Sequence, residues 1–175
     1  MNVAPPQSPP VRVERLSKGF YLGWYVGGTL AGVVLLIAGI FIWPLLVVAI
    51  PLIICAEVVW YVLLYKAWAS IQDGHARTGP CKAVGFCFIP FFSWYWVFQA
   101  YWGFAKDYNA YVSRRTTSPV RRLPEGLFLA YSILIVVGVL PLVNIVLVIP
   151  QFIIGAVMIN AVCDGVNSLP QAPNP

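Results

Sequence analysis

Residues 81–115 read CKAVGFCFIPFFSWYWVFQAYWGFAKDYNAYVSRR, and the predicted fold depends on how this stretch meets a membrane. The stretch is rich in aromatic residues, is apolar enough to enter a bilayer, and ends in a polar, charged segment. Pro90 interrupts it early, and a proline inside a helix removes a backbone hydrogen bond and kinks or ends the helix. The stretch therefore either crosses the bilayer once, over residues 83–105, or turns back at Pro90.

The basic residues on either side of the stretch separate these two topologies. A single crossing would place Lys106 and the arginines of residues 114–122 on the opposite side from the earlier basic residues. A reversal at Pro90 would leave all 11 Lys and Arg residues on one side, which agrees with the cytoplasmic bias of these residues. We therefore predict a re-entrant or interfacial hairpin, with aromatic residues of the kind that prefer the membrane interface at Trp94, Tyr95, Trp96, Tyr101 and Trp102.

The composition outside this stretch is also that of a membrane protein. Hydrophobic residues make up 60% of the 175 positions and charged residues 10%, against roughly 25% charged in an ordinary soluble domain; the mean hydropathy is +0.80. The net charge of +5 does not predict nucleic-acid binding, because the basic residues flank apolar runs instead of forming a stripe. This placement is typical of anchoring against anionic lipid.

Two charge-poor runs before the stretch predict a first transmembrane hairpin, with helices over residues 20–43 and 45–72. Each is long enough to cross a hydrocarbon core of about 30 Å, and Trp43-Pro44 marks an uncharged turn between them. We expect Pro51 to kink the second helix. Glycines at four-residue spacing allow a neighbouring helix to approach closely, and we predict packing against the second helix, with a dimer face as the alternative, for Gly23, Gly27, Gly28 and Gly32.

Glu57 is the one charged residue in residues 20–65. Nine residues separate it from Lys66, about 13 Å along a helix, so its carboxyl group should lie near mid-membrane. Insertion there costs roughly 2.5 to 3.5 kcal/mol, and such groups face the bundle interior. We expect a neutral, hydrogen-bonded structural carboxyl, with a proton or ion site as the alternative.

A second transmembrane hairpin is predicted after the basic loop of residues 114–125, with helices over residues 125–140 and 144–164. The run of residues 126–163 carries no charge and is too long for one helix, and Pro141 with Asn144 marks its turn. The fold class is thus an all-α integral membrane protein with four spanning helices in two hairpins and a central hairpin, residues 83–112, broken at Pro90. The single membrane domain covers residues 20–165, between disordered cytoplasmic tails at residues 1–19 and 166–175.

A faint internal repeat places Gln99 four residues before Gly103 and Gln151 four residues before Gly155. Residues four apart share a helix face, where the amide can bond across to a helix that the glycine holds close. We interpret both pairs as packing features, with a substrate site as the alternative. The candidate polar positions within the membrane are Glu57, Gln99, Gln151 and Asn160.

No catalytic constellation, metal site or cofactor site is predicted. The only histidine, His75, lies in a polar loop and cannot provide the paired axial ligands of a haem. The cysteine spacing does not match a zinc site. We therefore expect no enzymatic activity and no cofactor.

Two segments resemble a known group of proteins. They are IQDGHARTGPCKAVGFCFIPFFSWYWVFQAYWGFAKDYNAY and INAVCDGVNSLP, and they are similar to small bacterial polytopic membrane proteins that carry only a domain-of-unknown-function label. The resemblance covers about a third of the chain and rests on Ile89-Pro90-Phe91-Phe92, Gly103, Asp107 and Asn109. It implies a bacterial inner-membrane location and no particular activity.

Two functions are compatible with these features. The first is a non-enzymatic accessory or scaffold subunit whose partners are the lipid bilayer and other membrane subunits or a second copy, with both termini in the cytoplasm. The alternative is a small transporter or channel component that uses Glu57 and the broken helix at Pro90, since broken helices line transport sites. A continuous polar cavity that reaches Glu57 would favour the alternative.

Overall fold

A computed structural model describes residues 14–115 and 120–170 of the chain. The protein is all-helical, with 80% helix and no strand among the described residues. Most of the two predicted tails lies outside those residues. Their inner ends are packed against the protein, because Leu16 is 4% exposed and exchanges two hydrogen bonds with the Asn167 side chain, at 2.7 and 2.8 Å.

The first hairpin begins with a capped helix. The Ser17 hydroxyl accepts a hydrogen bond from the Phe20 amide, which satisfies one of the free donors at the start of a helix. One continuous helical rod follows, and the return helix continues through Pro51. The predicted helices 20–43 and 45–72 are thus each displaced by a few residues. The elements are α1 (Lys18–Leu22), the π-helical segment η1 (Gly23–Gly28), α2 (Thr29–Gly39), the short 3₁₀ turn η2 (Trp43–Leu45) and α3 (Leu46–Ala69).

The middle stretch forms a short hairpin with a sharp reversal. Pro90 lies between two helical segments, and Phe91 has a φ of 61°, a conformation that non-glycine residues rarely adopt. The predicted break at Pro90 is therefore present. The elements are α4 (Pro80–Gly85), η3 (Phe86–Phe88), α5 (Phe92–Val97), the π-helical segment η4 (Phe98–Trp102) and α6 (Gly103–Arg115).

The last hairpin consists of one short helix, α7 (Glu125–Val137), and one long helix, α8 (Pro141–Asn167). The prediction of residues 125–140 and 144–164 made α7 too long and α8 too short. Gly138 ends α7, and Pro141 starts α8 in the first helical turn, where a proline loses no hydrogen bond. The Gln151 amide closes the hairpin by donating to the Leu134 carbonyl.

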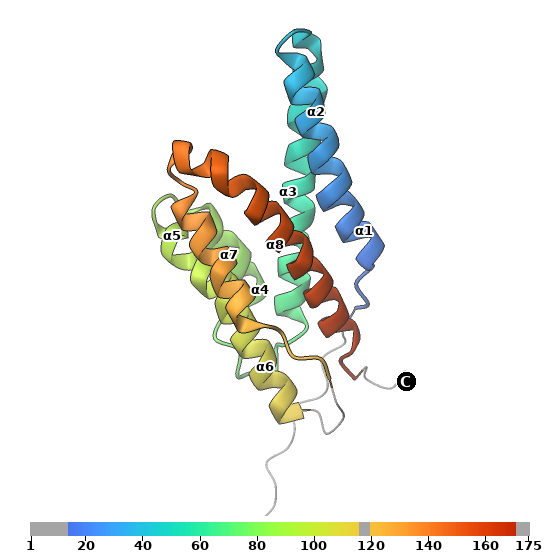
Figure 1. The fold of residues 1–175 in the computed structure, drawn as a ribbon. Helices are drawn as coiled ribbons and strands as arrows, with labels where there is room; N and C mark the ends of the chain where they lie inside the picture. The colour runs from blue at the N-terminus through green and yellow to red at the C-terminus, as the bar shows by residue number, and fades with distance from the viewer. Residues whose placement is uncertain (1–13, 116–119, 171–175) are drawn as a thin grey trace, which may run out of the picture.

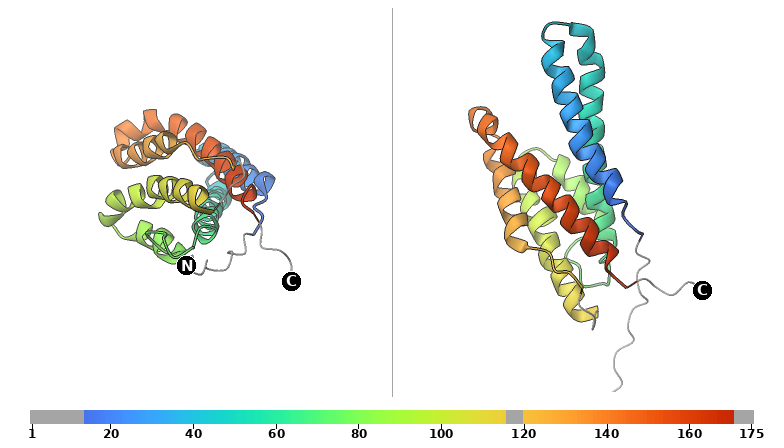
Figure 2. Two further views of the ribbon diagram at one scale, coloured as in Figure 1. Left: turned by 90° about the horizontal axis from the view of Figure 1, so that it is seen from below. Right: turned by 45° about the vertical axis from the view of Figure 1, so that its right-hand side comes forward.

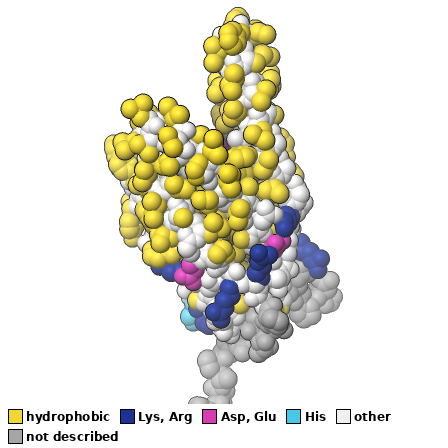
Figure 3. Space-filling model, in the orientation of Figure 1, with side chains coloured by type: hydrophobic (Ala, Val, Ile, Leu, Met, Phe, Trp, Pro, Cys, Tyr) yellow, Lys and Arg dark blue, Asp and Glu magenta, His cyan; other side chains and the backbone are white. Residues whose placement is uncertain are grey.

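The first hairpin projects beyond the other two (Figure 1; Figure 2, right). We call its outer part, residues 33–54, the tower. Most of the large apolar side chains in the tower are exposed. The charged side chains gather at the opposite end, as Figure 3 shows for one face. We call this end the polar foot; it comprises residues 14–18, 66–82, 106–115, 120–125 and 164–169.

Three helical stretches of the described chain are long and apolar enough to cross a membrane, which indicates a membrane protein. They are Lys18–Gly39, Trp43–Ala69 and Pro141–Asn167. The fourth predicted span, α7, has 13 residues, about 20 Å of helix, which is short of a hydrocarbon core of about 30 Å. The structure therefore shows three such helices where the sequence predicted four.

The glycines of the first hairpin point in two directions, which corrects the prediction that all four pack against the second helix. A Cβ atom added at Gly28 would lie 3.5 Å from the Ala56 Cβ, and one at Gly32 would lie 2.5 Å from the Ile53 Cγ1. Both glycines therefore let α3 approach closely. A Cβ atom at Gly23 or Gly27 would meet nothing within 4 Å, so these two face outward.

Replacement of Gly32 by leucine should lower the free energy of unfolding by about 1–3 kcal/mol, because the added atoms would overpack the contact with Ile53. The matched control is Gly27→Leu, which gains the same helix propensity but has open space around it. Thermal unfolding of both variants in the same detergent measures the difference. Equal losses of stability would contradict this account of the hairpin contact.

Candidate functional site

The polar foot is organised around one buried carboxylate, Asp73. Its side chain is 2% exposed and lies 3.1 Å from the Arg114 guanidinium, and its Oδ1 accepts the His75 amide at 3.0 Å. Burial alone would raise the pKa of Asp73, but the bonds from the His75 amide and Arg114 outweigh burial and hold the pKa below its usual value. The loop after α3 is thereby fixed to the end of α6.

A second ion pair fixes the same loop at another point of α6. The Asp107 carboxylate accepts three bonds from Arg77, one from the backbone amide at 2.9 Å and two from the guanidinium at 2.9 and 2.7 Å. The guanidinium also donates to the Gln99 Oε1 at 3.2 Å. It lies over Gly103, where a Cβ atom would be 3.4 Å from its Nη1. The helix face that Gln99 and Gly103 share therefore contacts the Arg77 side chain, and not a neighbouring helix as predicted.

Asp164 connects the beginning of the described chain with its end. Its carboxylate accepts bonds from Lys18 at 3.0 Å and from Arg121 at 3.2 Å. These three residues belong to α1, the segment before α7, and α8. The foot therefore holds the bases of the first and last hairpins together.

Replacement of Asp73 by asparagine should lower the free energy of unfolding by about 1–3 kcal/mol at pH 7, since it leaves the Arg114 guanidinium without its charge partner. Because the pKa of Asp73 is lowered in the folded protein, its contribution is complete above about pH 3.9, the pKa of an unfolded aspartate. The contribution is lost as the pH falls through the folded value. The difference between wild type and variant should therefore shrink below about pH 4.

The control for this comparison is Glu14→Gln, which removes the exposed pair with Lys66. Exposed ion pairs contribute little to stability, so the stability of this variant should match that of the wild type from pH 3 to 7. Thermal unfolding in one detergent over pH 3 to 7 gives all three curves. An Asp73→Asn variant with wild-type stability at pH 7 would contradict the anchoring role.

Above the foot, aromatic side chains from five elements form the centre of the protein. The Trp60 indole N–H donates to the Tyr101 hydroxyl at 2.8 Å, and the Tyr131 ring lies 5.4 Å from the Tyr101 ring. Tyr25 contacts Trp60 and stacks on Phe152 at 5.3 Å. All but Phe152 are at most 8% exposed. This cluster joins the first hairpin, η4, α7 and α8.

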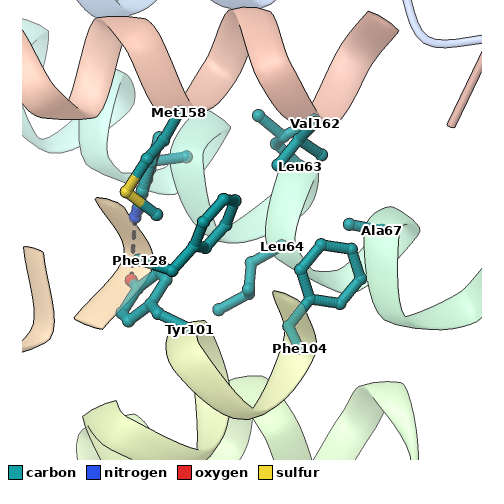
Figure 4. A pocket seen from close by; sticks show the side chains of 9 residues that line it. Leu63, Leu64, Ala67, Tyr101, Phe104, Phe128, Met158 and Val162 are labelled. Atoms are coloured by element: carbon teal, nitrogen blue, oxygen red, sulfur yellow. Dashed lines mark hydrogen bonds between the residues drawn. The ribbon is translucent and has the colours of Figure 1, made fainter. Parts of the chain in front are cut away.

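A small hollow of about 20 Å³ lies beside this cluster, between Trp60, Tyr101 and Met158. Figure 4 shows its lining and the hydrogen bond to the Tyr101 hydroxyl. Its volume corresponds to about one water molecule, and an apolar cavity of this kind stays dry. It is therefore a gap in the packing and not a substrate pocket.

Glu57 lies on α3 one turn beyond Trp60 and is exposed, which corrects the prediction that it faces the bundle interior. It has no hydrogen bond or ion pair with any described residue. The Tyr25, Tyr61 and Tyr131 side chains lie within its electrostatic reach.

The structure does not bring the four candidate polar residues together into one site. Gln99 bonds Arg77 at the foot, and Gln151 bonds the Leu134 carbonyl across the last hairpin. Asn160 donates to the Ala156 carbonyl of its own helix. Only Glu57 lacks a partner among the described residues. Gly155 has a packing role, because the Tyr25 hydroxyl occupies the place of a side chain there.

The predicted interface aromatics divide into three groups. Trp94 and Tyr95 are exposed, as residues at a membrane interface would be. Trp96 and Trp102 are half-buried, and Trp102 lies 3.4 Å beneath the Lys106 ammonium, a cation–π contact. Tyr101 is 4% exposed and belongs to the central cluster, so its assignment to the interface was wrong.

Sequence reasoning missed the aromatic partners of this cluster. Trp60 follows Glu57 by three residues, which places both on one face of a helix, and that spacing was visible in the sequence. The positions of Tyr25 and Tyr131 depend on packing between hairpins, which no local pattern encodes. Among the described residues, no group of three or more His, Cys, Asp or Glu side chains could hold a metal ion.

The fold and these contacts define a helical protein with apolar hairpins that rise from a polar foot. No family model matches the chain, and neither a curated protein nor a solved structure is detectably similar to it.

Proposed function

We propose that this protein is a non-enzymatic subunit of a membrane complex, which packs in the bilayer against other membrane proteins. The observation that carries the proposal is the tower. Its side chains are apolar and exposed on all sides, for example Val34 at 64% and Val48 at 57%. The outward face at Gly23 and Gly27 supports it, because small residues allow close helix contact in lipid.

The contacts inside the protein support a scaffold in preference to a transport path. The hollow beside the central cluster has a volume of only about 20 Å³ and is apolar. The two larger hollows are lined by residues around Gly27 and around Lys66, and neither includes Glu57.

For the topology, we propose that the α4–α5 hairpin enters the bilayer and returns to the side from which it came. Its exposed tip carries Phe88, Ile89 and Phe91. The arm before Pro90, α4 with η3, has nine residues, about 14 Å of helix, which is too short to cross the bilayer. The last hairpin then enters the bilayer through the short α7 and returns to the foot through α8. Both termini and the polar foot face the cytoplasm of a bacterial cell, in keeping with the basic residues at the foot.

Single cysteines at Lys82 and Arg122, in a background without the four native cysteines, should both react with a membrane-impermeant maleimide from the cytoplasmic side. A cysteine at Trp43, in the turn of the first hairpin, should react from the other side. Intact cells and inverted vesicles give the two readings. Reaction of the Lys82 and Arg122 positions from opposite sides would overturn the re-entrant topology.

The subunit proposal is tested with a photo-reactive amino acid at Val34 and, as a second tower site, at Val48. Irradiation in native membranes should give discrete protein adducts larger than the 19.3 kDa chain. Arg122, exposed at the foot, is the control position. The measurement is the mass of the adducts by electrophoresis and mass spectrometry. Adducts with lipid alone at both tower positions would contradict the proposal.

A further inference from the structure

Glu57 is a polar residue of an apolar helix, α3, and has no partner among the described residues. It lies about 13 Å along α3 from Lys66, the nearest basic residue of that helix. A charged group at this depth is costly, and such groups normally pair with another residue or face a polar space. Among the described residues, no side chain gives it a hydrogen bond or an ion pair. A partner from outside the chain would remove this cost.

The position of Glu57 on α3 shows where such a partner would lie. One face of the helix, read towards the foot, carries Ile50 and Ile54, which are exposed, then Glu57, and then Trp60, which is 7% exposed. Glu57 therefore marks the point at which this face passes from open surface into the core. Figure 3 shows a notch between the tower and the last hairpin on this face of the molecule.

The walls of this notch are suited to a helix. The α3 face beside Glu57 is apolar, with Ile50 at 50% and Ile54 at 55% exposure. Apolar helix surfaces with one polar group are the usual form of helix recognition in lipid.

We propose that Glu57 is the docking point for a transmembrane helix of a different protein, which carries a lysine or arginine at mid-membrane depth. This inference rests on the subunit function proposed above and names the chemistry of the partner. Charge complementarity favours a helix of a different protein over a second copy of this chain. A second copy has no Lys or Arg in residues 19–65, 83–105 or 126–163, so its apolar helices cannot supply the cation.

An ion pair at Glu57 would give specificity as well as affinity. A cation beside the carboxylate in a low-dielectric environment interacts more strongly than in water, and removal of one member of such a pair leaves the other unpaired. Apolar contacts along the notch cannot distinguish one apolar helix from another, because lipid chains compete for them equally. The basic residue would therefore select the partner helix, and the apolar walls would orient it.

The test uses the full-length protein in phosphatidylcholine vesicles, which carry no net charge, and synthetic transmembrane peptides. The peptides are leucine-rich helices of about 20 residues with lysine, glutamine or leucine at the central position. A fourth peptide carries the lysine two turns away from the centre. Energy transfer between a dye on the peptide and a dye on the foot of the protein reports binding.

The central-lysine peptide should bind at least tenfold more tightly than the leucine, glutamine and displaced-lysine peptides. Glu57→Gln keeps the size of the side chain and should abolish this preference, and its thermal unfolding verifies that it is folded. Val58→Gln is the matched control, because it places an amide on the neighbouring exposed position and leaves the carboxylate in place. It should retain the preference.

Equal binding of the lysine and glutamine peptides would overturn the inference, as would a lysine preference that survives in Glu57→Gln. These outcomes leave the subunit proposal intact if the tower still gives protein adducts in native membranes. Lipid adducts alone at the tower would contradict the subunit proposal, whatever the peptides do.

Discussion

The fold depends on the confinement of charge to one end of the molecule. Backbone and side-chain polar groups inside a bilayer must be satisfied within the protein, so the long loops of this chain can exist only where water reaches them. Asp73 with Arg114 and Asp107 with Arg77 convert the longest of these loops into a fixed platform. The hairpins keep their spacing because their bases are bound to this platform, while their outer ends contact one another little (Figure 1).

The sequence determines the hairpins more clearly than it determines their ends. Charge-free runs, together with Pro44, Pro90 and Pro141, correctly indicated where the chain reverses. The observed helix boundaries differ from the predicted ones by several residues. Ser17 caps α1, so this helix starts at Lys18, and Gly138 ends α7 earlier than predicted. The fourth span was inferred from the length of an apolar run, yet that run is divided unequally between α7 and α8.

The candidate site was only partly accessible from the sequence. Glu57 could be recognised because a carboxyl group in an apolar run is rare. Its exposure could not be recognised, because the face of α3 that is buried depends on where the last hairpin packs. The same limit applies to Gln99. A four-residue spacing with Gly103 shows a shared face, but it does not identify Arg77, which is 22 positions away, as the group that occupies that face.

The bonds between Leu16 and Asn167 join residues that are 151 positions apart, and Lys18 with Asp164 joins residues 146 positions apart. A membrane protein is inserted from its N-terminus as the ribosome makes it, so α1 enters the bilayer long before α8 exists. Until then, the first hairpin can contact the middle stretch, for example through Trp60 and Tyr101, but its base lacks the bonds to α8. Translation of α8 is therefore the event that completes the structure. A ribosome that stops within the last hairpin would release an inserted chain whose base is still open.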